Sequence, residues 1–278
     1  MTRQSMFPIA ALVLLSSSLF LGAQAPAVQA PRGAAPGTPG TPGATAPGRG
    51  AAGQRGPAGP AAPANVAFHN ERNDMRHQTF VDLAKKGSID LLFVGDSITD
   101  WFYWPLGARG AATGGKVWEA NFAPLKAADF AIAGDTTQGV LWRMQNGELD
   151  GFKAKLIVLM LGTNNIGRNP DDEIVDGDRL ILEEFKKRQP QAKILLLGIF
   201  PRTLDGKAAI RTQIKGINTK LEKLADNKQI TYMDIGEKFL ATDGTLTTEV
   251  MADGLHPTEK GYQIWADAIL PTVKRLMQ

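Results

Sequence analysis

The stretch LLFVGDSITDWF, from Leu91 to Phe102, is the part of the chain from which its fold can be worked out. Four apolar residues run up to Gly95, then Asp96 and Ser97 follow, and aromatic side chains come soon after them. A short, continuous apolar run of this kind is typical of a strand that is covered on both faces. Its abrupt polar end has two interpretations: an ordinary strand end, or a serine presented at the rim of a sheet for chemistry.

The composition is that of a globular protein with a substantial core. The chain has 278 residues, of which 43% are apolar and 21% charged, both within the normal range for soluble domains. It contains no cysteine. Disulfides, thiolate metal sites, a cysteine nucleophile and a lipidated cysteine are therefore excluded.

The charge is unevenly distributed. Residues 1–65 contain four of the 31 basic side chains and none of the 28 acidic ones, so the remainder has a net charge of −1. No basic stripe of the kind that neutralises phosphates is visible. We therefore do not expect a nucleic-acid partner.

Residues 1–30 have the pattern of a secretory signal peptide. Arg3 is followed by the apolar run FPIAALVLLSSSLFLGA, and residues 23–25 and 28–30 both fit a small-x-small cleavage site. The alternative is an uncleaved membrane anchor, but serines 16–18 interrupt the run, which is shorter than the roughly 20 residues that span a bilayer. We expect an exported protein, periplasmic or secreted, with no membrane span after cleavage.

Residues 31–64 consist almost entirely of Pro, Gly, Ala and Thr. Such a segment cannot bury enough apolar surface to offset the entropy of ordering it, so we expect a disordered linker. Glycines 50, 53, 56 and 59 keep a collagen-like period of three, but four triplets are too few for a triple helix. The folded domain is predicted to cover residues 65–278.

Five apolar runs and four helical patterns organise this domain. The runs are residues 89–95, 128–134, 155–162, 193–200 and 230–236, and the helical patterns are residues 137–149, 171–188, 207–227 and 258–276. Strands that alternate with helices predict a parallel sheet covered by helices on both faces, an α/β fold. Ligands bind such sheets outside the carboxyl ends of the strands.

Three of the predicted strands end in glycine followed by small polar residues. The endings are GDS (95–97), GDT (134–136) and GTNN (162–165). One such ending carries little information, but three at the same edge of a parallel sheet describe a polar pocket.

A serine nucleophile needs a base and a group that orients the base. His69 and His77 lie in a charged N-terminal segment and have the pattern of surface residues, whereas His256 lies just before the last helix, three residues after Asp253. Asp253 could accept the Nδ1–H of His256 and leave Nε2 facing Ser97. A loop with helix-capping residues is the other interpretation of the same segment.

Acyl transfer also needs donors for the developing oxyanion. The backbone N–H groups of Ser97 and Gly134 and the side-chain amide of Asn164 are the candidates. Taken singly, Gly134 also fits a simple turn, and Asn164 a turn or helix cap.

At this point the sequence resembles a known family. The segments GDSIT, AIAGDTT, LGTNN and DGLHP, in this order, are similar to the four conserved blocks of the SGNH (GDSL) hydrolases. The segments GDTTQGVLWRMQNGEL (134–149) and RQPQAKILLLGIFPR (188–202) carry a narrower resemblance, to the alpha subunits of intracellular platelet-activating-factor acetylhydrolase. The resemblance covers residues 85–278, and four blocks in order are far more specific than a lone GDS.

The resemblance implies a flavodoxin-like three-layer α/β/α sandwich with a five-stranded parallel sheet, and no metal or cofactor. It implies Ser97 as nucleophile, His256 as base and then acid, and Asp253 as the residue that orients it. It also implies an oxyanion hole made by Ser97, Gly134 and Asn164. The export signal departs from the intracellular acetylhydrolase subunits, and residues 101–116 are an insertion after the nucleophile.

That insertion bears on the substrate. Trp101 and Trp104 could form the floor of a pocket for an acyl chain or a sugar ring, or could pack against the top of the sheet. Asp135 and Thr136 are expected to line the same cleft.

Three further side chains are expected to have structural roles and no direct part in the reaction. The carboxylate of Asp96 is expected to hold the turn before Ser97. For Trp142 and Arg143 we expect packing together with a surface or partner contact.

We therefore predict an exported serine esterase that cleaves short acyl esters, acetyl foremost, from small esters or acylated carbohydrates. A lysophospholipase or lipase acting on lipid esters is the alternative, and a non-catalytic carbohydrate-binding module on the same fold is a third interpretation. A homodimer is the assembly that the sequence leaves open.

Overall fold

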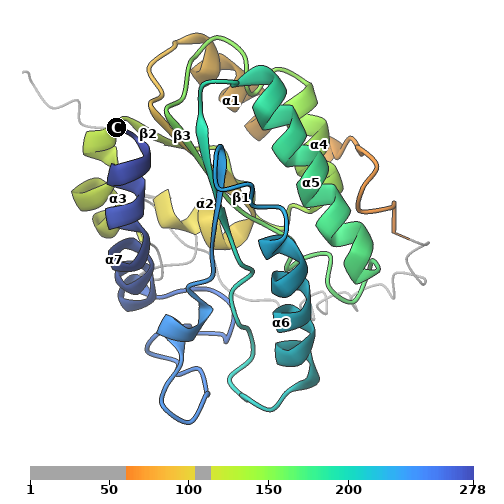
Figure 1. The fold of residues 1–278 in the computed structure, drawn as a ribbon, viewed down its shortest axis with the longest axis vertical. Coiled ribbons are helices and arrows are strands. Elements are labelled where there is room, and N and C mark those ends of the chain that lie inside the picture. Colours follow the sequence, from red (N-terminus) through yellow and green to blue (C-terminus); the bar gives the residue numbers. More distant parts are fainter. Residues whose placement is uncertain (1–60, 104–113) are drawn as a thin grey trace, which may run out of the picture. The chain divides into compact units, whose positions relative to one another are not determined.

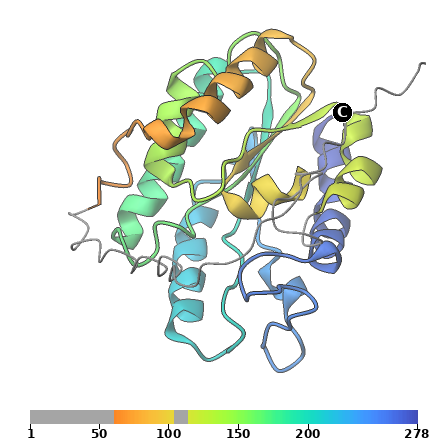
Figure 2. The ribbon, with the colours of Figure 1, turned by 180° about the vertical axis from the view of Figure 1, so that it is seen from behind.

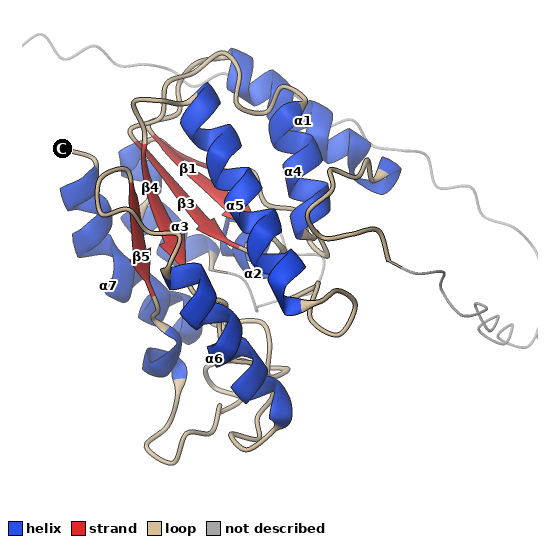
Figure 3. Ribbon diagram, turned by 45° about the vertical axis from the view of Figure 1, so that its right-hand side comes forward, coloured by secondary structure: helices blue, strands red, loops and turns tan. Residues whose placement is uncertain are grey.

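The computed structural model describes residues 61–103 and 114–278, and a five-stranded parallel sheet lies at their centre (Figures 1 and 3). The strand order is β2-β1-β3-β4-β5. The strands are β1 (Leu91–Gly95), β2 (Ala127–Asp129), β3 (Leu156–Met160), β4 (Lys193–Leu197) and β5 (Ile230–Met233). Each strand lies in one of the five apolar runs or begins one residue before it, so the predicted fold class is confirmed.

Seven α-helices and three 3₁₀-helices occur in the described residues. They are η1 (Glu71–Asn73), α1 (Asp74–Lys85), α2 (Ser97–Tyr103), α3 (Gly115–Asn121), η2 (Ala123–Leu125), α4 (Thr137–Gln145), α5 (Asp171–Arg188), α6 (Ala209–Glu222), η3 (Gly236–Phe239) and α7 (Glu259–Leu276). Within these ranges, no helix combines the length and the apolar character that crossing a membrane requires.

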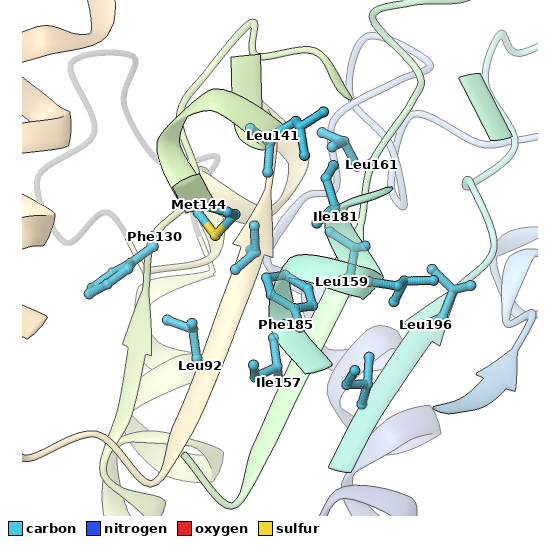
Figure 4. Close-up of a cluster of buried hydrophobic side chains, with 14 of the residues drawn as sticks. Leu92, Phe130, Leu141, Met144, Ile157, Leu159, Leu161, Ile181, Phe185 and Leu196 are labelled. Carbon is cyan, nitrogen blue, oxygen red and sulfur yellow. The ribbon is translucent and has the colours of Figure 1, made fainter. Parts of the chain in front are cut away.

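Alternating strand residues divide the apolar side chains between two cores. Leu92 and Val94 of β1 face the core that α1, α4, α5 and α6 cover, whereas Leu91 and Phe93 face the core under α2, α3 and α7. Figure 4 shows the first core, in which Phe185 lies against the sheet, and Figure 2 shows the helices on either side of the sheet from behind. These three layers are the predicted α/β/α arrangement.

The short strand β2 differs from the longer run predicted at residues 128–134. The Asp129 carboxylate accepts a hydrogen bond from the N–H of Ala131 at 2.8 Å, which bends the chain out of regular pairing. The chain nevertheless follows β1, because the N–H of Phe130 donates to Phe93 O at 2.9 Å and that of Ile132 to Gly95 O at 3.4 Å. The segment that leads to Gly134 is therefore a loop supported by the sheet edge.

Helix α5 begins and ends where the sequence pattern predicted it, at residues 171 and 188. Asp171, Asp172 and Glu173 lie in its first turn, and Lys186, Lys187 and Arg188 in its last. These charges complement the helix dipole at both ends.

The residues just before the first helices attach to α4 and α5. The carbonyl of Ala62 accepts hydrogen bonds from the side-chain amides of Gln138 and Asn169. Ala64 is fully buried, its N–H donates to Glu173, and its carbonyl accepts from Thr137 Oγ1 at 2.7 Å. This strap, residues 62–65, is part of the packed unit.

Gly95 is the last residue of β1, two residues before the start of α2. The surrounding atoms leave no room for a side chain at this position. A Cβ added there would lie 2.7 Å from Met160 O and 2.3 Å from Thr99 Oγ1, whereas one added at Gly216, in α6, would meet nothing within 4 Å. We expect Gly95→Ala to lower the free energy of unfolding by about 1–3 kcal/mol through overpacking. Gly216→Ala, the control, should raise it by about 0.5–1 kcal/mol.

The measurement is the urea midpoint of each variant. Equal midpoints for Gly95→Ala and wild type would show that the turn tolerates a side chain.

Candidate active site

Ser97 is the first residue of α2, and one residue separates it from the end of β1. Figure 1 labels both elements. A tight turn at Asp96 joins the two elements. The Asp96 carboxylate accepts from the N–H of Ile98 at 3.0 Å, and the Asp96 carbonyl accepts from the N–H groups of Thr99 and Asp100. Asp96 thus holds the turn, as expected. Because Ser97 lies in the first turn of a helix, its own N–H has no intrahelical partner.

His256 comes from the loop before α7, 159 residues away along the chain, and contacts Ser97. The Ser97 Oγ and His256 Nε2 atoms are 2.9 Å apart, and His256 Nδ1 lies 2.7 Å from Asp253 Oδ2. A carboxylate can only accept here, so the Nδ1 atom carries the proton and Nε2 accepts from the serine hydroxyl. The structure therefore brings together all three residues that the sequence singled out.

The Asp253 carboxylate is fixed from within its own loop. Its Oδ1 accepts from the backbone N–H groups of Leu255 at 3.0 Å and His256 at 2.8 Å. Partial burial raises the pKa of Asp253, but the hydrogen bonds from His256 and Leu255 outweigh it and hold the pKa below its usual value. Asp253 is therefore ionised at neutral pH.

The two expected oxyanion donors lie on the loops that follow β2 and β3, the neighbours of β1. Gly134 is exposed, has φ +82°, and faces open space where a Cβ would be. Glycine is the residue that adopts this conformation without strain. The Asn164 side-chain amide donates one hydrogen to Asp135 O at 2.9 Å. Its second hydrogen is the one that a ligand could use.

A buried carboxylate on α2 links the helix that begins at Ser97 to the Gly134 turn. Asp100 accepts from the N–H of Ala133 at 3.0 Å and from Arg76 at 2.7 Å. Arg76 also donates to Ala131 O at 3.2 Å. Burial raises the pKa of Asp100, and Arg76 opposes that shift. Sequence patterns do not reveal this pair, because Arg76 and Asp100 belong to different helices.

A second buried cluster lies behind the same turn. Arg143 donates to the Asp135 carboxylate at 2.9 Å, to Phe130 O at 3.1 Å and to Glu148. Glu148 also contacts His77 Nδ1, at 2.8 Å. Arg143 is only 2% exposed, so the surface contact expected for it is wrong. His77 is largely buried as well and does not behave as a surface residue.

The residues expected to contact the substrate differ in how accessible they are. Asp135 is 2% exposed, and its carboxylate is occupied by Arg143 and by the N–H of Thr136; a ligand contact there would have to come from its backbone. Thr136 is half-buried and precedes the first residue of α4. Trp104 lies outside the described residues.

Trp101 lies against the histidine of the site. Its ring stacks on the imidazole of His256, with 3.9 Å between centroids and 28° between planes. Sequence reasoning placed Trp101 near the nucleophile but did not find this contact.

Metal ligands do not gather in this part of the chain. Among the described residues, no group of three His, Asp or Glu side chains is arranged so that it could hold an ion.

Comparison with known proteins gives consistent matches. The model of the GDSL-like lipase/acylhydrolase family matches residues 93–264. The chain is 38% identical over 192 residues to the human platelet-activating factor acetylhydrolase IB subunit alpha2, covering 67% of this chain and 77% of that protein. It is 31% identical over 202 residues to the bovine alpha1 subunit, covering 72% and 82%.

Solved structures share the fold. A GDSL-like lipase from Bacteroides thetaiotaomicron superposes with a TM-score of 0.55 at 18% identity, over 74% of this chain and 97% of that one. A catalytic mutant of an acetylxylan esterase from Geobacillus stearothermophilus superposes with a TM-score of 0.52 at 24% identity, over 67% and 95%.

The Arg143 cluster should be important for stability. Arg143→Met would leave Asp135 and Glu148 buried without their cation, so we expect a loss of about 3–5 kcal/mol in the free energy of unfolding. Arg179 is the matched control, because it also pairs with two carboxylates but is 43% exposed. Arg179→Met should cost about 1 kcal/mol or less. Urea unfolding measures both, and equal losses would contradict the assigned role of Arg143.

Asp96 should make stability depend on pH. Burial raises its pKa from 3.8 to about 7, and the hydrogen bond from Ile98 only partly offsets this. Because the folded-state pKa is the higher one, ionisation opposes folding, and stability is lost as pH rises from about 4 through 7. Asp96→Asn keeps an acceptor for Ile98 without the charge.

The gain in stability from Asp96→Asn should therefore be larger at pH 8 than at pH 4.5, as measured by urea unfolding. A gain independent of pH would show that Asp96 is not a source of this dependence.

Proposed function

The chain belongs to the GDSL-like lipase/acylhydrolase family, and we propose that it is an exported serine esterase that removes acetyl groups from acylated carbohydrates and other small esters. That it is a carboxylic ester hydrolase follows from the family. The nucleophile, the acyl group, the alcohol and the compartment are the parts proposed here.

The observation that carries the proposal is the continuous hydrogen-bonded chain from Asp253 through His256 to Ser97. His256 Nε2 takes the Ser97 Oγ proton as Oγ attacks the ester carbonyl carbon, while Nδ1–H stays on Asp253. The tetrahedral intermediate then collapses, and the alcohol leaves with the proton from Nε2. Water repeats the sequence on the acyl-Ser97 ester and releases the acid.

The oxyanion of each tetrahedral intermediate needs fixed donors. The Ser97 N–H at the start of α2, the N–H of Gly134 and the free hydrogen of the Asn164 amide are the proposed set. Loss of one such donor costs about 3–4 kcal/mol of transition-state stabilisation. Asp100 and Arg143 keep the turn that bears Gly134 in place through buried bonds.

The relatives support acetyl as the acyl group, since the 38% identical alpha2 subunit is an acetylhydrolase by name. The alcohol is inferred from the predicted signal at residues 1–30, because an exported enzyme encounters acetylated polysaccharides. The amino-terminal sequence of protein recovered outside the cytoplasm checks the export, and an intact Met1 there would contradict cleavage.

A lipid ester is the second candidate substrate. It is favoured by the same relatives, whose names specify platelet-activating factor.

The test uses wild type and Ser97→Ala on p-nitrophenyl acetate, butyrate and octanoate. We expect the acetate to be hydrolysed fastest and Ser97→Ala to lower kcat by at least about 10⁴-fold, with an unchanged urea midpoint. Because His256 must be neutral to accept the Ser97 proton, hydrolysis should also fall as pH decreases and the imidazole becomes protonated. If wild type is inactive, or both proteins are equally active, the esterase proposal fails.

The alcohol part of the substrate is tested by comparing kcat/KM for an acetylated xylo-oligosaccharide with kcat/KM for an acetylated phospholipid. A higher kcat/KM for the sugar supports the proposal, whereas a higher value for the lipid replaces it with the second candidate.

A further inference from the structure

We propose that Trp101 is a positioning residue for His256, and that its indole face stabilises the imidazolium that forms when the Ser97 proton reaches Nε2. This inference rests on the proposed function, since it assigns a role in the same proton transfer. It replaces the sequence-based expectation that Trp101 forms the floor of a substrate pocket.

The placement of Trp101 follows from helix geometry. Trp101 comes four residues after Ser97 in α2, so both side chains lie on the same face of the helix. The Ser97 hydroxyl meets the edge of the His256 ring at Nε2, and the Trp101 ring covers its face at 3.9 Å. One short helix thus supplies both contacts to the base.

The stacking of Trp101 on the face of the His256 ring restricts tilting of that ring, which the hydrogen bonds at the ring nitrogens leave free. The bonds of His256 to Ser97 and Asp253 both lie at ring nitrogens, so they fix where the edge points but resist tilting of the ring only weakly. The Asp253 side chain is 56% exposed, whereas His256 is 14% exposed. Water therefore screens the carboxylate and weakens its hold on the ring. A large aromatic surface against the ring compensates for that weakness.

The contact also changes in strength during the reaction. The face of an indole ring is electron-rich and attracts a cation, with Trp the strongest of the aromatic residues. His256 is neutral before attack and positively charged after it accepts the Oγ proton. The indole therefore stabilises the charged state more than the neutral one, which is the requirement for lowering a barrier.

Charged and titratable groups also occur on the segments that pack around the loop bearing the His256 ring. Asp253 is the carboxylate in contact with it. Tyr262, from α7, is buried and donates to Ile98 O on α2. Arg202, on the loop after β4, donates to Thr163 O.

The experiment compares Trp101→Leu with Trp101→Phe. Leucine keeps the apolar cover but has no π face, whereas phenylalanine keeps a weaker one. With p-nitrophenyl acetate and butyrate, we expect Trp101→Leu to lower kcat about five- to thirtyfold for both esters with little change in KM. Trp101→Phe should restore most of the loss.

Trp142 provides the matched control. It stacks on His69 with 4.0 Å between centroids and 16° between planes, and neither residue belongs to the Ser97–His256–Asp253 chain. Trp142→Leu removes a comparable Trp–His stack and should leave kcat within about twofold of wild type. An equal loss in this control would assign the effect to general destabilisation and overturn the inference.

Two further measurements report on the contact directly. The midpoint of the acidic limb of the kcat/KM profile should move to lower pH by about 0.5–1 unit in Trp101→Leu, because the imidazolium loses stabilisation. In a Trp142→Leu background, which removes the second Trp–His stack, indole emission should fall as His256 is protonated. This titration should be absent when Trp101→Phe or His256→Asn is added. The emission experiment needs no substrate.

A KM that rises more for butyrate than for acetate, with kcat and the acidic limb unchanged, would make Trp101 a substrate contact and overturn the inference. That outcome requires an active wild type and an inactive Ser97→Ala variant. It is therefore distinct from failure of the esterase proposal, in which wild type hydrolyses nothing or Ser97→Ala is equally active.

Discussion

Parallel pairing of β1 with both β2 and β3 is the constraint on which the site depends. The register sets Gly95 opposite Met160 and Phe93 opposite Asp129, so three strands end at one edge of the sheet. Each strand is followed by a turn that carries small polar groups, and those turns meet only because the strands run in one direction. His256, which contacts Ser97, comes from one more loop, the one before α7.

Buried charge holds these turns in place. Arg76 and Arg143 are the cations, and they meet carboxylates on α2, on the Gly134 turn and after α4. Acidic groups are in excess in this interior, since Asp129 and Asp178 are also buried and burial raises the pKa of both well above its usual value. Burial therefore makes the ionised form of these two side chains costly, in contrast to the carboxylates that Arg76 and Arg143 neutralise.

Local patterns predicted most of the fold and the three residues that the structure joins in the Ser97–His256–Asp253 chain. Helix α5 matched its amphipathic and charged pattern residue for residue, and Ser97 was found because a buried strand stops there. Pairings such as Arg76 with Asp100, or Glu148 with His77, were missed because they join residues 24 and 71 apart, and sequence spacing carries no signal for them. Trp101 was found, but its partner was not, because stacking on His256 depends on how the last loop folds back over α2.

The strap at residues 62–65 has a consequence for how the protein can be produced and trimmed. Its bonds reach Thr137 and Asn169, and Asn169 in turn accepts from Asn165, the residue after Asn164. The strap at the end of the low-complexity sequence therefore supports the loop that follows β3 through hydrogen bonds. A recombinant fragment or a proteolytic product that begins after Asn65 would lose these contacts while keeping Ser97, Asp253 and His256. A fragment that preserves the loop therefore has to begin before Ala62.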